Sequence, residues 1–382
     1  MAKIGLNMIV KNEAKVIKRL LDSVSKLIDW YTIVDTGSKD NTKEIIKETM
    51  DAHGIPGEII DHEWINYCDA RNRALEEIKG KADWGFWIDA DEVVQYDEFD
   101  KKALIKSFKG YNQLGISVSY GNMNYSRDQF FRVERNWEWL GAVHEVLVLK
   151  DEPIENGGVV QGISVKINTD GNTWGNRTSK EIKAKYRGHA KMLLNYVEDS
   201  SEPRWIFYLA QSYRDAGNFK EAEKWYRKRV ENKDGYWEER YVAQLNYAAC
   251  LKKNGKPVEK WTSAFLECSK YDFKRAEHFI PVIMQYQAEE NWPMAYALGK
   301  YCMDNCSNNP FPKSKLFVDN TCYDWKILDL HMLSVFYLAK NVELKTLMYI
   351  LDDKIENGVI PESQLKRIET NKKFYVRQIK PF

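Results

Sequence analysis

The chain has 382 residues, of which 44% are hydrophobic and 30% are charged, and its formal net charge is +1. This balance is typical of a globular protein, and the length allows two domains with separate cores. A nearly neutral chain lacks the positive field that holds nucleic acid or an anionic membrane, so we expect neither as a partner. No apolar run reaches the roughly 18 residues of a transmembrane helix, and we therefore expect a cytoplasmic protein.

The first part of the chain alternates between strand and helix patterns. Residues Ile4 to Val10 read as a strand, and an amphipathic helix follows between Val16 and Ile28. A strand at Trp30 to Val34, a helix at Thr42 to Met50 and a strand at Glu58 to Asp61 continue the series. This order predicts an α/β, Rossmann-like domain with a mainly parallel sheet and right-handed crossovers.

An acidic motif ends a short apolar run in the segment Trp84 to Glu92. The run is too short for a helix and reads as a buried strand whose carboxyl end opens into a polar crevice. Asp89 and Asp91 alternate along the extended chain, so both carboxylates can converge on one divalent cation that also binds phosphate. The spacing predicts a metal-diphosphate site, although such a pair can also simply cap a strand or turn. From Glu92 to Lys109 we expect mostly helix.

Four segments of the chain, in order, resemble the successive motifs of family 2 glycosyltransferases. They are Asn7 to Ala14, Val34 to Thr42, Asp69 to Leu75 and Trp87 to Glu92. The resemblance covers roughly the first 150 residues and implies the GT-A nucleotide-sugar fold. It also implies a nucleotide diphosphate sugar as donor, for which we expect a UDP-sugar, and Mn²⁺ or Mg²⁺ as the metal.

The resemblance assigns the nucleoside base to two neighbouring strand ends. The backbone of Met8, Ile9 and Val10 and the carboxylate of Asp35 would hold the base. A carboxylate can accept a hydrogen bond from an N–H of the uracil type, which agrees with this role. Asp35 could instead only shape its turn.

The same resemblance assigns the sugar-phosphate part of the donor. Arg71 would lie near the phosphates or the base, Asp89 near the ribose and metal, and Asp91 on the metal itself. A guanidinium matches phosphate oxygens in a fork geometry, although Arg71 could also form a surface ion pair on its helix. Asn12 and Glu13 are candidates for the donor site and equally for capping the first helix.

The segment Trp137 to Glu145 also resembles the family, in which a W-x-G-x-x-H-E stretch closes the site over the sugar. An inverting transfer needs a base that takes the proton of the attacking acceptor group. Glu145 is the first candidate for this base and Glu138 the second. His144 is a candidate metal ligand or phosphate contact, with a structural histidine as the alternative.

One departure from the family concerns the metal. Related enzymes often carry an H-x-G shortly before the linker helix, whereas this chain has Asn168 to Gly171, without a histidine. Either Asp170 or His144 replaces it or the metal is held more loosely, which leaves the metal's identity open. In the loop that follows, Trp174 either lies over the bound sugar or anchors the domain interface.

The chain then changes character, and we predict three regions. Residues 1–170 form the GT-A domain, 171–200 a linker loop and helix, and 201–382 a tetratricopeptide-like helical domain. The 34-residue helix-turn-helix pattern is clearest in one segment, where apolar, small and aromatic residues occur at the positions that the tetratricopeptide pattern requires. These are Ile206, Leu209, Ala210, Tyr213, Gly217, Ala222 and Tyr226. Such helix stacks often bind peptides, but this half could also support the catalytic domain or form a homodimer.

The sequence therefore predicts a metal-dependent, inverting glycosyltransferase. It would move a hexose to a glycan, lipopolysaccharide or peptide acceptor. The helical domain could present this acceptor. The layout resembles peptide S-glycosyltransferases that modify bacteriocins, which does not by itself fix a cysteine acceptor. Two alternatives stay open: a tetratricopeptide-type binding or scaffold protein that has lost catalysis, and a nucleotidyltransferase. Against the second, no Gly-rich loop with Lys or Arg follows the first strand to hold a triphosphate.

Overall fold

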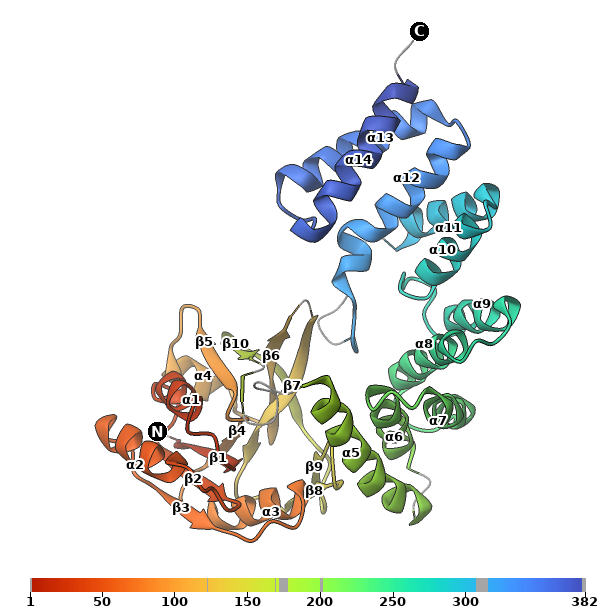
Figure 1. Cartoon of the computed structure of the whole chain (residues 1–382). Coiled ribbons are helices and arrows are strands. Elements are labelled where there is room, and N and C mark those ends of the chain that lie inside the picture. The colour runs from red at the N-terminus through yellow and green to blue at the C-terminus, as the bar shows by residue number, and fades with distance from the viewer. Residues whose placement is uncertain are drawn as a thin grey trace. The chain divides into compact units, whose positions relative to one another are not determined.

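The computed structural model describes residues 2–121, 123–168, 170–171, 178–199, 202–306 and 315–379. The chain forms two compact units, Met1–Gly217 and Asn218–Phe382. Figure 1 shows an α/β architecture in the first unit, and the described elements of the second unit are all helical. The predicted combination of an α/β domain with a tetratricopeptide-like helical domain is confirmed. Among the described residues, no helix is both long and apolar enough to cross a membrane.

The first unit is built on an eight-stranded sheet with the order β3-β2-β1-β4-β7-β6-β10-β5. Its strands are β1 (Ile4–Val10), β2 (Trp30–Asp35), β3 (Gly57–Asp61), β4 (Trp84–Trp87), β5 (Glu92–Tyr96), β6 (Gln113–Tyr120), β7 (Met123–Arg132) and β10 (Asn156–Ile167). The pairs β1–β2, β2–β3, β1–β4 and β6–β10 are parallel, and the pairs of β4–β7, β6–β7 and β10–β5 are antiparallel. A separate antiparallel pair joins β8 (Trp137–Leu140) to β9 (Val146–Leu149).

The helices of the first unit pack on this sheet or follow it in the chain. They are α1 (Ile17–Val24), α2 (Thr42–Ala52), α3 (Tyr67–Glu77), α4 (Lys101–Ser107), α5 (Ser179–Asp199) and α6 (Pro203–Asp215). In α1 the buried positions Ile17, Leu20, Leu21 and Val24 recur with helical spacing, so one face packs on the sheet. α1 and α2 lie on one face of the sheet and α3 on the other (Figure 1).

The strand order creates a topological switch point between β1 and β4. From β1 the chain moves outward through β2 to β3, and then returns through α3 to β4 on the opposite side of β1. Ligands of open α/β sheets bind in the crevice at the carboxyl ends of such strands. β1 ends at Val10 and β4 at Trp87, so the residues that follow these two positions border the crevice.

The expectation of mostly helix from Glu92 to Lys109 is wrong for its first part. Residues Glu92–Tyr96 form β5, and only Lys101–Ser107 form a helix. Burial alternates along the start of β5, with Glu92 and Val94 buried, and the strand pairs antiparallel with β10. This period of two and the β-branched pair Val93-Val94 are typical of a strand, and the helix begins only after the capping residue Asp100.

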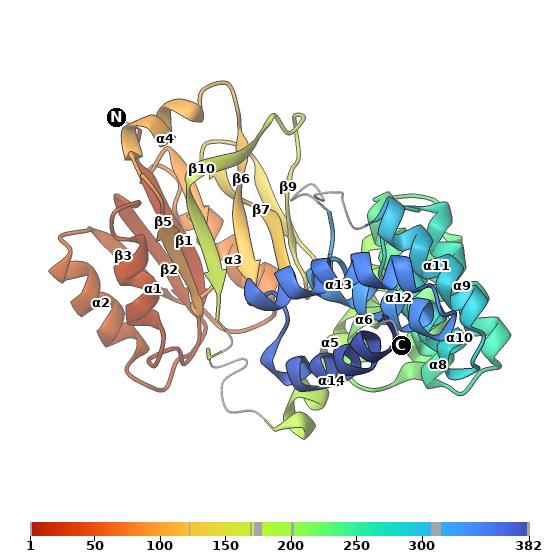
Figure 2. The same cartoon turned by 90° about the horizontal axis from the view of Figure 1, so that it is seen from above.

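The second unit contains helices that pack against their neighbours in chain order (Figure 2). They are α7 (Phe219–Glu231), α8 (Trp237–Lys253), α9 (Val258–Leu266), α10 (Phe279–Ala288), α11 (Trp292–Asn305), α12 (Ile327–Tyr337), α13 (Asn341–Glu356) and α14 (Glu362–Ile379). A π-helical turn at Cys322–Lys326 precedes α12. Gly255 joins α8 to α9 with a φ of +68°, a conformation that glycine adopts without strain.

The compact units divide the chain within the clearest tetratricopeptide pattern. That pattern spans α6 and α7, and the division between Gly217 and Asn218 puts α6 in the first unit. The helix predicted from Ser179 is α5, which also belongs to the first unit. The domain boundaries at residues 170 and 200 stay a prediction.

Candidate active site

Asp35 ends β2 at the rim of the crevice and is only 1% exposed. Its Oδ1 accepts hydrogen bonds from the N–H groups of Gly37 and Ser38, at 2.8 and 2.7 Å, and these bonds shape the turn. Its Oδ2 is buried and has no hydrogen-bond partner among the described residues. A buried oxygen without a donor is costly, so Oδ2 fits an N–H that a ligand brings. Oδ1 thus confirms the turn-forming role of Asp35, and base binding by Oδ2 stays a prediction.

The loop after β1 is tied to the loop after β2. The N–H of Asn12 donates to Ser38 Oγ at 2.8 Å, and Asn12 Oδ1 accepts from the N–H of Lys39 at 2.7 Å. The N–H of Glu13 donates to Thr42 Oγ1 at 2.8 Å. Asn12 has a φ of +57°, which asparagine tolerates better than most residues. These bonds make one continuous wall of the crevice from two strand ends.

The backbone at the end of β1 borders the crevice on one side. β1 pairs with β2 along its length up to Val10 and Asp35, whereas the described pairing with β4 stops at Asn7 and Trp87. The main chain of Met8, Ile9 and Val10 therefore continues past the end of β4. This placement is what the predicted backbone contacts to a base require.

Asp89 and Asp91 lie in the short turn between β4 and β5. Glu92 accepts a hydrogen bond from the N–H of Asp89 at 3.2 Å and pairs with Arg127 Nη2 at 2.6 Å. Burial, reinforced by the carboxylates of Asp89, Glu92 and Glu13, raises the pKa of Asp91 to about 7. A carboxylate surrounded in this way is stabilised by any cation that binds beside it.

These carboxylates fit a divalent metal ion that is shared with a ligand. Mg²⁺ and Mn²⁺ favour oxygen donors and are commonly held by one or two carboxylates together with phosphate oxygens and water. Within the described residues, no group of three or more His, Cys, Asp or Glu side chains converges on one point. The metal site at Asp89 and Asp91 therefore stays a prediction.

Arg71 connects the acidic turn to the predicted closing segment. It is 6% exposed and lies between the rings of Trp87 and Trp139, whose centroids are 5.1 and 4.9 Å from its Cζ. Its Nη2 donates to Asp89 Oδ1 at 2.7 Å and its Nε to Glu145 Oε1 at 2.6 Å. Burial opposes the charge of Arg71, but the carboxylates of Asp89 and Glu145 outweigh it and raise the pKa of Arg71. Arg71 is therefore a buried crosslink in place of the surface ion pair considered from the sequence.

The electrostatics of Asp89 differ from those of its neighbour Asp91. Burial acts to raise the pKa of Asp89, but the guanidinium groups of Arg71 and Arg127 outweigh it and the pKa is lowered. Asp89 is thus ionised at neutral pH, whereas the Asp91 carboxyl, with a pKa of about 7, is only partly ionised there. A cation that binds here would meet the negative charge of Asp89 and would favour loss of the proton from Asp91.

The two candidate bases occupy different places in the closing segment. Glu145 is 11% exposed and shares Arg71 with Asp89, which brings it to the acidic turn. Glu138 lies on β8 and pairs with Lys150 at 2.9 Å. α3 also fixes the backbone of Trp139, because Asn72 accepts its N–H at 2.7 Å and donates to its carbonyl at 3.0 Å. The geometry favours Glu145 over Glu138 for chemistry at the crevice.

His144 turns away from the acidic turn toward α5 and α6. Its ring stacks on Tyr208 with centroids 4.1 Å apart, and the ring of His189 is 6.2 Å away. Burial, with His189, Arg204 and Lys185 adding to it, lowers the pKa of His144 to about 3. The imidazole is therefore neutral, but its positive neighbours favour the phosphate contact over the metal ligand considered from the sequence.

The segment in place of the family's H-x-G lies against Asp91. Asn168 donates its N–H and its Nδ2 to the carbonyl of Asp91, at 3.1 and 3.2 Å. Asp170 pairs with Arg19 through two bonds of 2.6 and 2.7 Å. A side chain on Gly171 would come within 2.7 Å of the Asp91 Cβ. Trp174, the candidate contact to the sugar, lies outside the described residues.

Sequence reasoning missed several residues that shape this site. Arg19 lies on the polar side of α1 and has no motif, and only the fold brings it to Asp170. Arg127 on β7 pairs with buried Glu92, and the strand was not predicted as such. Tyr208 and His189 were assigned to the linker and helical regions. Their signal lies in the spacing of Lys185 and His189 and of Arg204 and Tyr208, each one helical turn apart.

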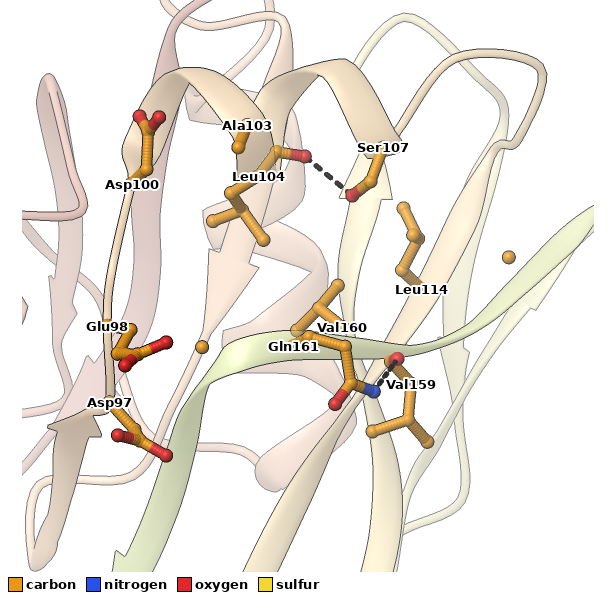
Figure 3. Close-up of a pocket in the computed structure, with 12 residues that line it drawn as sticks. Asp97, Glu98, Asp100, Ala103, Leu104, Ser107, Leu114, Val159, Val160 and Gln161 are labelled. Atoms are coloured by element: carbon orange, nitrogen blue, oxygen red, sulfur yellow. Dashed lines mark hydrogen bonds between the residues drawn. The ribbon is translucent and has the colours of Figure 1, made fainter.

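A cavity of about 450 Å³ lies at the opposite end of β5 (Figure 3). Acidic side chains line one side of it, Asp97, Glu98 and Asp100, and apolar Leu104 and Leu114 lie on the other. It shares no residue with the crevice described above. The charged crevice at the switch point therefore remains the candidate active site.

Part of the chain matches a known protein family. Residues 7–182 match the family described as Glycosyl transferase family 2. The SPbeta prophage-derived glycosyltransferase SunS of Bacillus subtilis is 25% identical over 256 residues, which cover 65% of this chain and 58% of SunS. This chain thus spans less than two thirds of that relative's length.

Two further similarities cover parts of the chain. A TPR repeat-containing protein of Synechococcus elongatus is 36% identical over 152 residues, covering 38% of this chain and 36% of that protein. The crystal structure of S. aureus TarS is 14% identical with a TM-score of 0.32, covering 71% of this chain and 53% of TarS. The chain carries a family 2 glycosyltransferase domain joined to a tetratricopeptide-like helical domain.

Proposed function

We propose that the family 2 glycosyltransferase domain of this chain transfers a hexose from a nucleotide diphosphate sugar to an acceptor nucleophile, with inversion at the anomeric carbon. The proposal is carried by the crevice at the switch point between β1 and β4. There the orphaned Oδ2 of Asp35 and the electrostatically strained Asp91 flank the same strand ends. Asp35 suits a nucleoside base, and Asp91 suits a metal ion bound to a diphosphate.

The nucleotide is a uridine diphosphate. An ionised Asp35 can only accept a hydrogen bond at Oδ2, which favours a base with a ring N–H, such as uracil, thymine or guanine, over cytosine. Uracil is our choice among the three, and the panel of sugars below tests it. The backbone of Met8 to Val10 provides donors and acceptors for the other edge of the base. Asn12 and Glu13 support the wall on which the nucleoside rests.

The leaving diphosphate develops negative charge as the glycosidic bond breaks. A Mn²⁺ or Mg²⁺ ion stabilises this charge when it is bound. Asp91 and Asp89 would hold the ion, and the hydrogen bond from Arg71 Nη2 orients the Asp89 carboxylate. Asn168 keeps the Asp91 main chain in place, and Gly171 leaves room for its side chain.

Glu145 acts as the general base. The acceptor hydroxyl or thiol attacks the anomeric carbon, its proton passes to Glu145, and the bond from that carbon to the diphosphate breaks with its electrons on the diphosphate. Arg71 Nε holds Glu145 Oε1, and we therefore assign the proton to Oε2. Because attack and departure occur on opposite faces, the configuration inverts.

The acceptor is a glycan or a peptide that the helical domain presents. Tetratricopeptide-type stacks expose surfaces that bind extended partners. Tyr236, Trp237 and Phe273 of the second unit are 46%, 45% and 52% exposed, and such rings stack on sugars or peptide side chains. A glycosyltransferase, as the relative SunS is named, needs a surface that binds its acceptor.

The donor assignment is tested by thermal unfolding with UDP-, GDP-, dTDP- and CMP-sugars, each with and without manganese. A ligand at 100 times its Kd stabilises the folded state by about 2.7 kcal/mol. We expect this gain for UDP-sugars with manganese, and its loss in Asp91→Asn and Asp35→Asn. The exposed Asp51, at the end of α2, gives the matched control Asp51→Asn, which should keep the full gain. Stabilisation by none of the sugars would contradict the proposal.

A further inference from the structure

Two histidines next to the proposed base have buried nitrogens without partners. His144 Nε2 and His189 Nδ1 are both buried, and neither makes a hydrogen bond within the part of the chain that is described. His144 directly precedes Glu145, and His189 lies on α5 with 9% exposure. Their rings are 6.2 Å apart in an edge-to-face arrangement. Buried polar atoms are nearly always paired, so two exceptions this close together point to a ligand.

Tyrosine rings enclose the two imidazoles. Tyr208 stacks on His144 at 4.1 Å, whereas Tyr186 and Tyr67 meet His189 edge to face, at 5.6 and 6.5 Å. All three tyrosines are half-buried, so the group extends to the protein surface. It joins three separate segments of the first unit: the start of α3, the α5–α6 pair and the loop before β9.

Two cationic side chains of α5 and α6 adjoin this group. Arg204 on α6 lies with its Cζ 4.9 Å from the ring centre of Tyr208, and its Nη2 donates to the carbonyl of His144 at 3.4 Å. Lys185 precedes His189 by one turn of α5. The charged groups that act on His144, after burial, are His189, Arg204 and Lys185, and all of them lower its pKa. Burial and Lys185 likewise lower the pKa of His189, to about 4.

The surroundings of His144 and His189 do not suit a metal ion. Neutral imidazoles can bind metals, but the nearby ammonium and guanidinium groups repel a cation. An oxyanion is attracted by the same charges and can accept hydrogen bonds from the imidazole N–H groups and the guanidinium. Both orphaned nitrogens can then carry the proton that the ligand needs, because each imidazole is neutral and its tautomer can adapt.

We propose that His144, His189, Arg204, Lys185 and Tyr208 form a subsite for an oxyanion, a phosphate or a carboxylate, that is part of the acceptor. The assignment to the acceptor rests on the proposed function. The carboxylate of Glu145 reaches Arg71 and Asp89 on the donor side, while its chain neighbour His144 enters the subsite. An acceptor group attacked beside Glu145 thus places its neighbouring substituents near these residues. α5 and α6, the first helices after the sheet, would then set acceptor specificity.

The test uses protein labelled with ¹⁵N at its six histidines. Imidazole nitrogen signals are recorded in EDTA while inorganic phosphate or acetate replaces chloride at constant ionic strength. We expect one of the two anions to shift the signals of His144 and His189 in a saturable way, and the more effective anion identifies the acceptor group. The half-exposed His53 pairs with Asp22 and serves as the internal reference. No saturable shift, or an equal shift at His53, would overturn the proposal.

Two variants test the subsite itself. His189→Phe keeps an aromatic ring but removes the nitrogens, and Arg204→Gln removes the charge without altering α5. Each should weaken anion binding at least tenfold, whereas His53→Phe should leave it unchanged. Each variant is a separate test, so if one of them folds poorly the other still tests the proposal. An unchanged anion affinity in the folded variants would contradict it.

A competition experiment separates the acceptor subsite from the donor site. Saturating UDP with manganese is added to the protein with its anion bound. We expect the anion to remain, since the diphosphate is held at Asp91. Displacement of the anion by UDP would assign these residues to the donor and overturn the inference. Anion binding in a protein that binds no UDP-sugar would instead contradict the proposed function and leave the subsite in place.

Discussion

Arg71 gives the sharpest test of how the site is assembled. The substitution Arg71→Met keeps a long apolar side chain between Trp87 and Trp139 but removes the charge that Asp89 and Glu145 share. Glu145 is 11% exposed, so losing its charged partner costs about 1.5–3 kcal/mol. Asp89 is 43% exposed and can regain water, so its share is at most about 1 kcal/mol. We expect a total loss near 3 kcal/mol in the free energy of unfolding of the first unit.

The measurement is urea denaturation followed by fluorescence, with a control on the same helix. Arg73 is 40% exposed and pairs with Glu76 and Glu77 at the surface of α3. Arg73→Met should therefore change stability by no more than about 0.5 kcal/mol. Such a large contrast between neighbours on one helix reflects burial of the ion pair and not helix propensity.

A double-mutant cycle tests the cause. Adding Glu145→Gln to Arg71→Met removes the buried carboxylate that was left without a partner, so the double variant should be more stable than Arg71→Met alone. Arg71→Lys should lie between wild type and Arg71→Met, because one ammonium cannot bind both carboxylates in the fork geometry of a guanidinium. If Arg71→Met loses no more stability than Arg73→Met, the reasoning about the buried crosslink is refuted.

Three further predictions concern Asp91, Gly171 and His278. Because the pKa of Asp91 is raised to about 7, a metal must displace its proton at pH 6 but not at pH 8. The Mn²⁺ affinity measured by calorimetry should therefore rise about tenfold over this interval, and a change below twofold would be inconsistent. Gly171→Ala places a Cβ 2.7 Å from that of Asp91 and should weaken Mn²⁺ binding, whereas Gly188→Ala, with open space around it, should not. Burial, followed by Arg275, lowers the pKa of His278 in the second unit to about 3. The unfolded chain then binds a proton below about pH 6.5 that the folded chain refuses, so stability falls by about 1.4 kcal/mol per pH unit between pH 6 and 4. Urea titrations at these pH values should show a flatter dependence in His278→Gln, and an equal slope would contradict the assignment.

The strand ends that hold the site were predictable because they obey local rules. The run from Ile4 to Val10 is fully apolar apart from Asn7 and Gly5, and the short run to Trp87 is bounded by carboxylates. Strand-helix alternation then requires that both carboxyl ends lie at one edge of the sheet. For this reason Asp35, at the end of β2, and Asp89 and Asp91, after β4, lie at the same edge of the sheet.

The partners of these carboxylates were not predictable in the same way. Arg71 was expected near the donor, but its contact with Glu145 spans 74 positions in the chain and depends on how β8 packs on α3. Asn72 fixes that packing through the backbone of Trp139, an interaction that no sequence pattern announces. The pairing of Arg19 with Asp170 spans an even longer stretch.

The mistaken helix at Glu92 shows a different limit. The predicted helix from Glu92 to Lys109 included a segment that pairs with β10 as a strand. Antiparallel pairing with a strand some 70 residues later overrides local propensity, as tertiary contacts commonly do. The same override explains why β7, with its polar side chains, was not recognised as a strand.

The most direct test of the central claim is turnover of UDP-hexoses, measured as release of free UDP with water or an added sugar as acceptor. The account predicts UDP release that needs manganese in the wild type. Glu145→Gln should retain binding of UDP and manganese but lose at least about a hundredfold in rate, as expected for the loss of a general base. Asp91→Asn should lose both binding and turnover. Release of pyrophosphate from UTP, or full turnover in Glu145→Gln, would contradict the account.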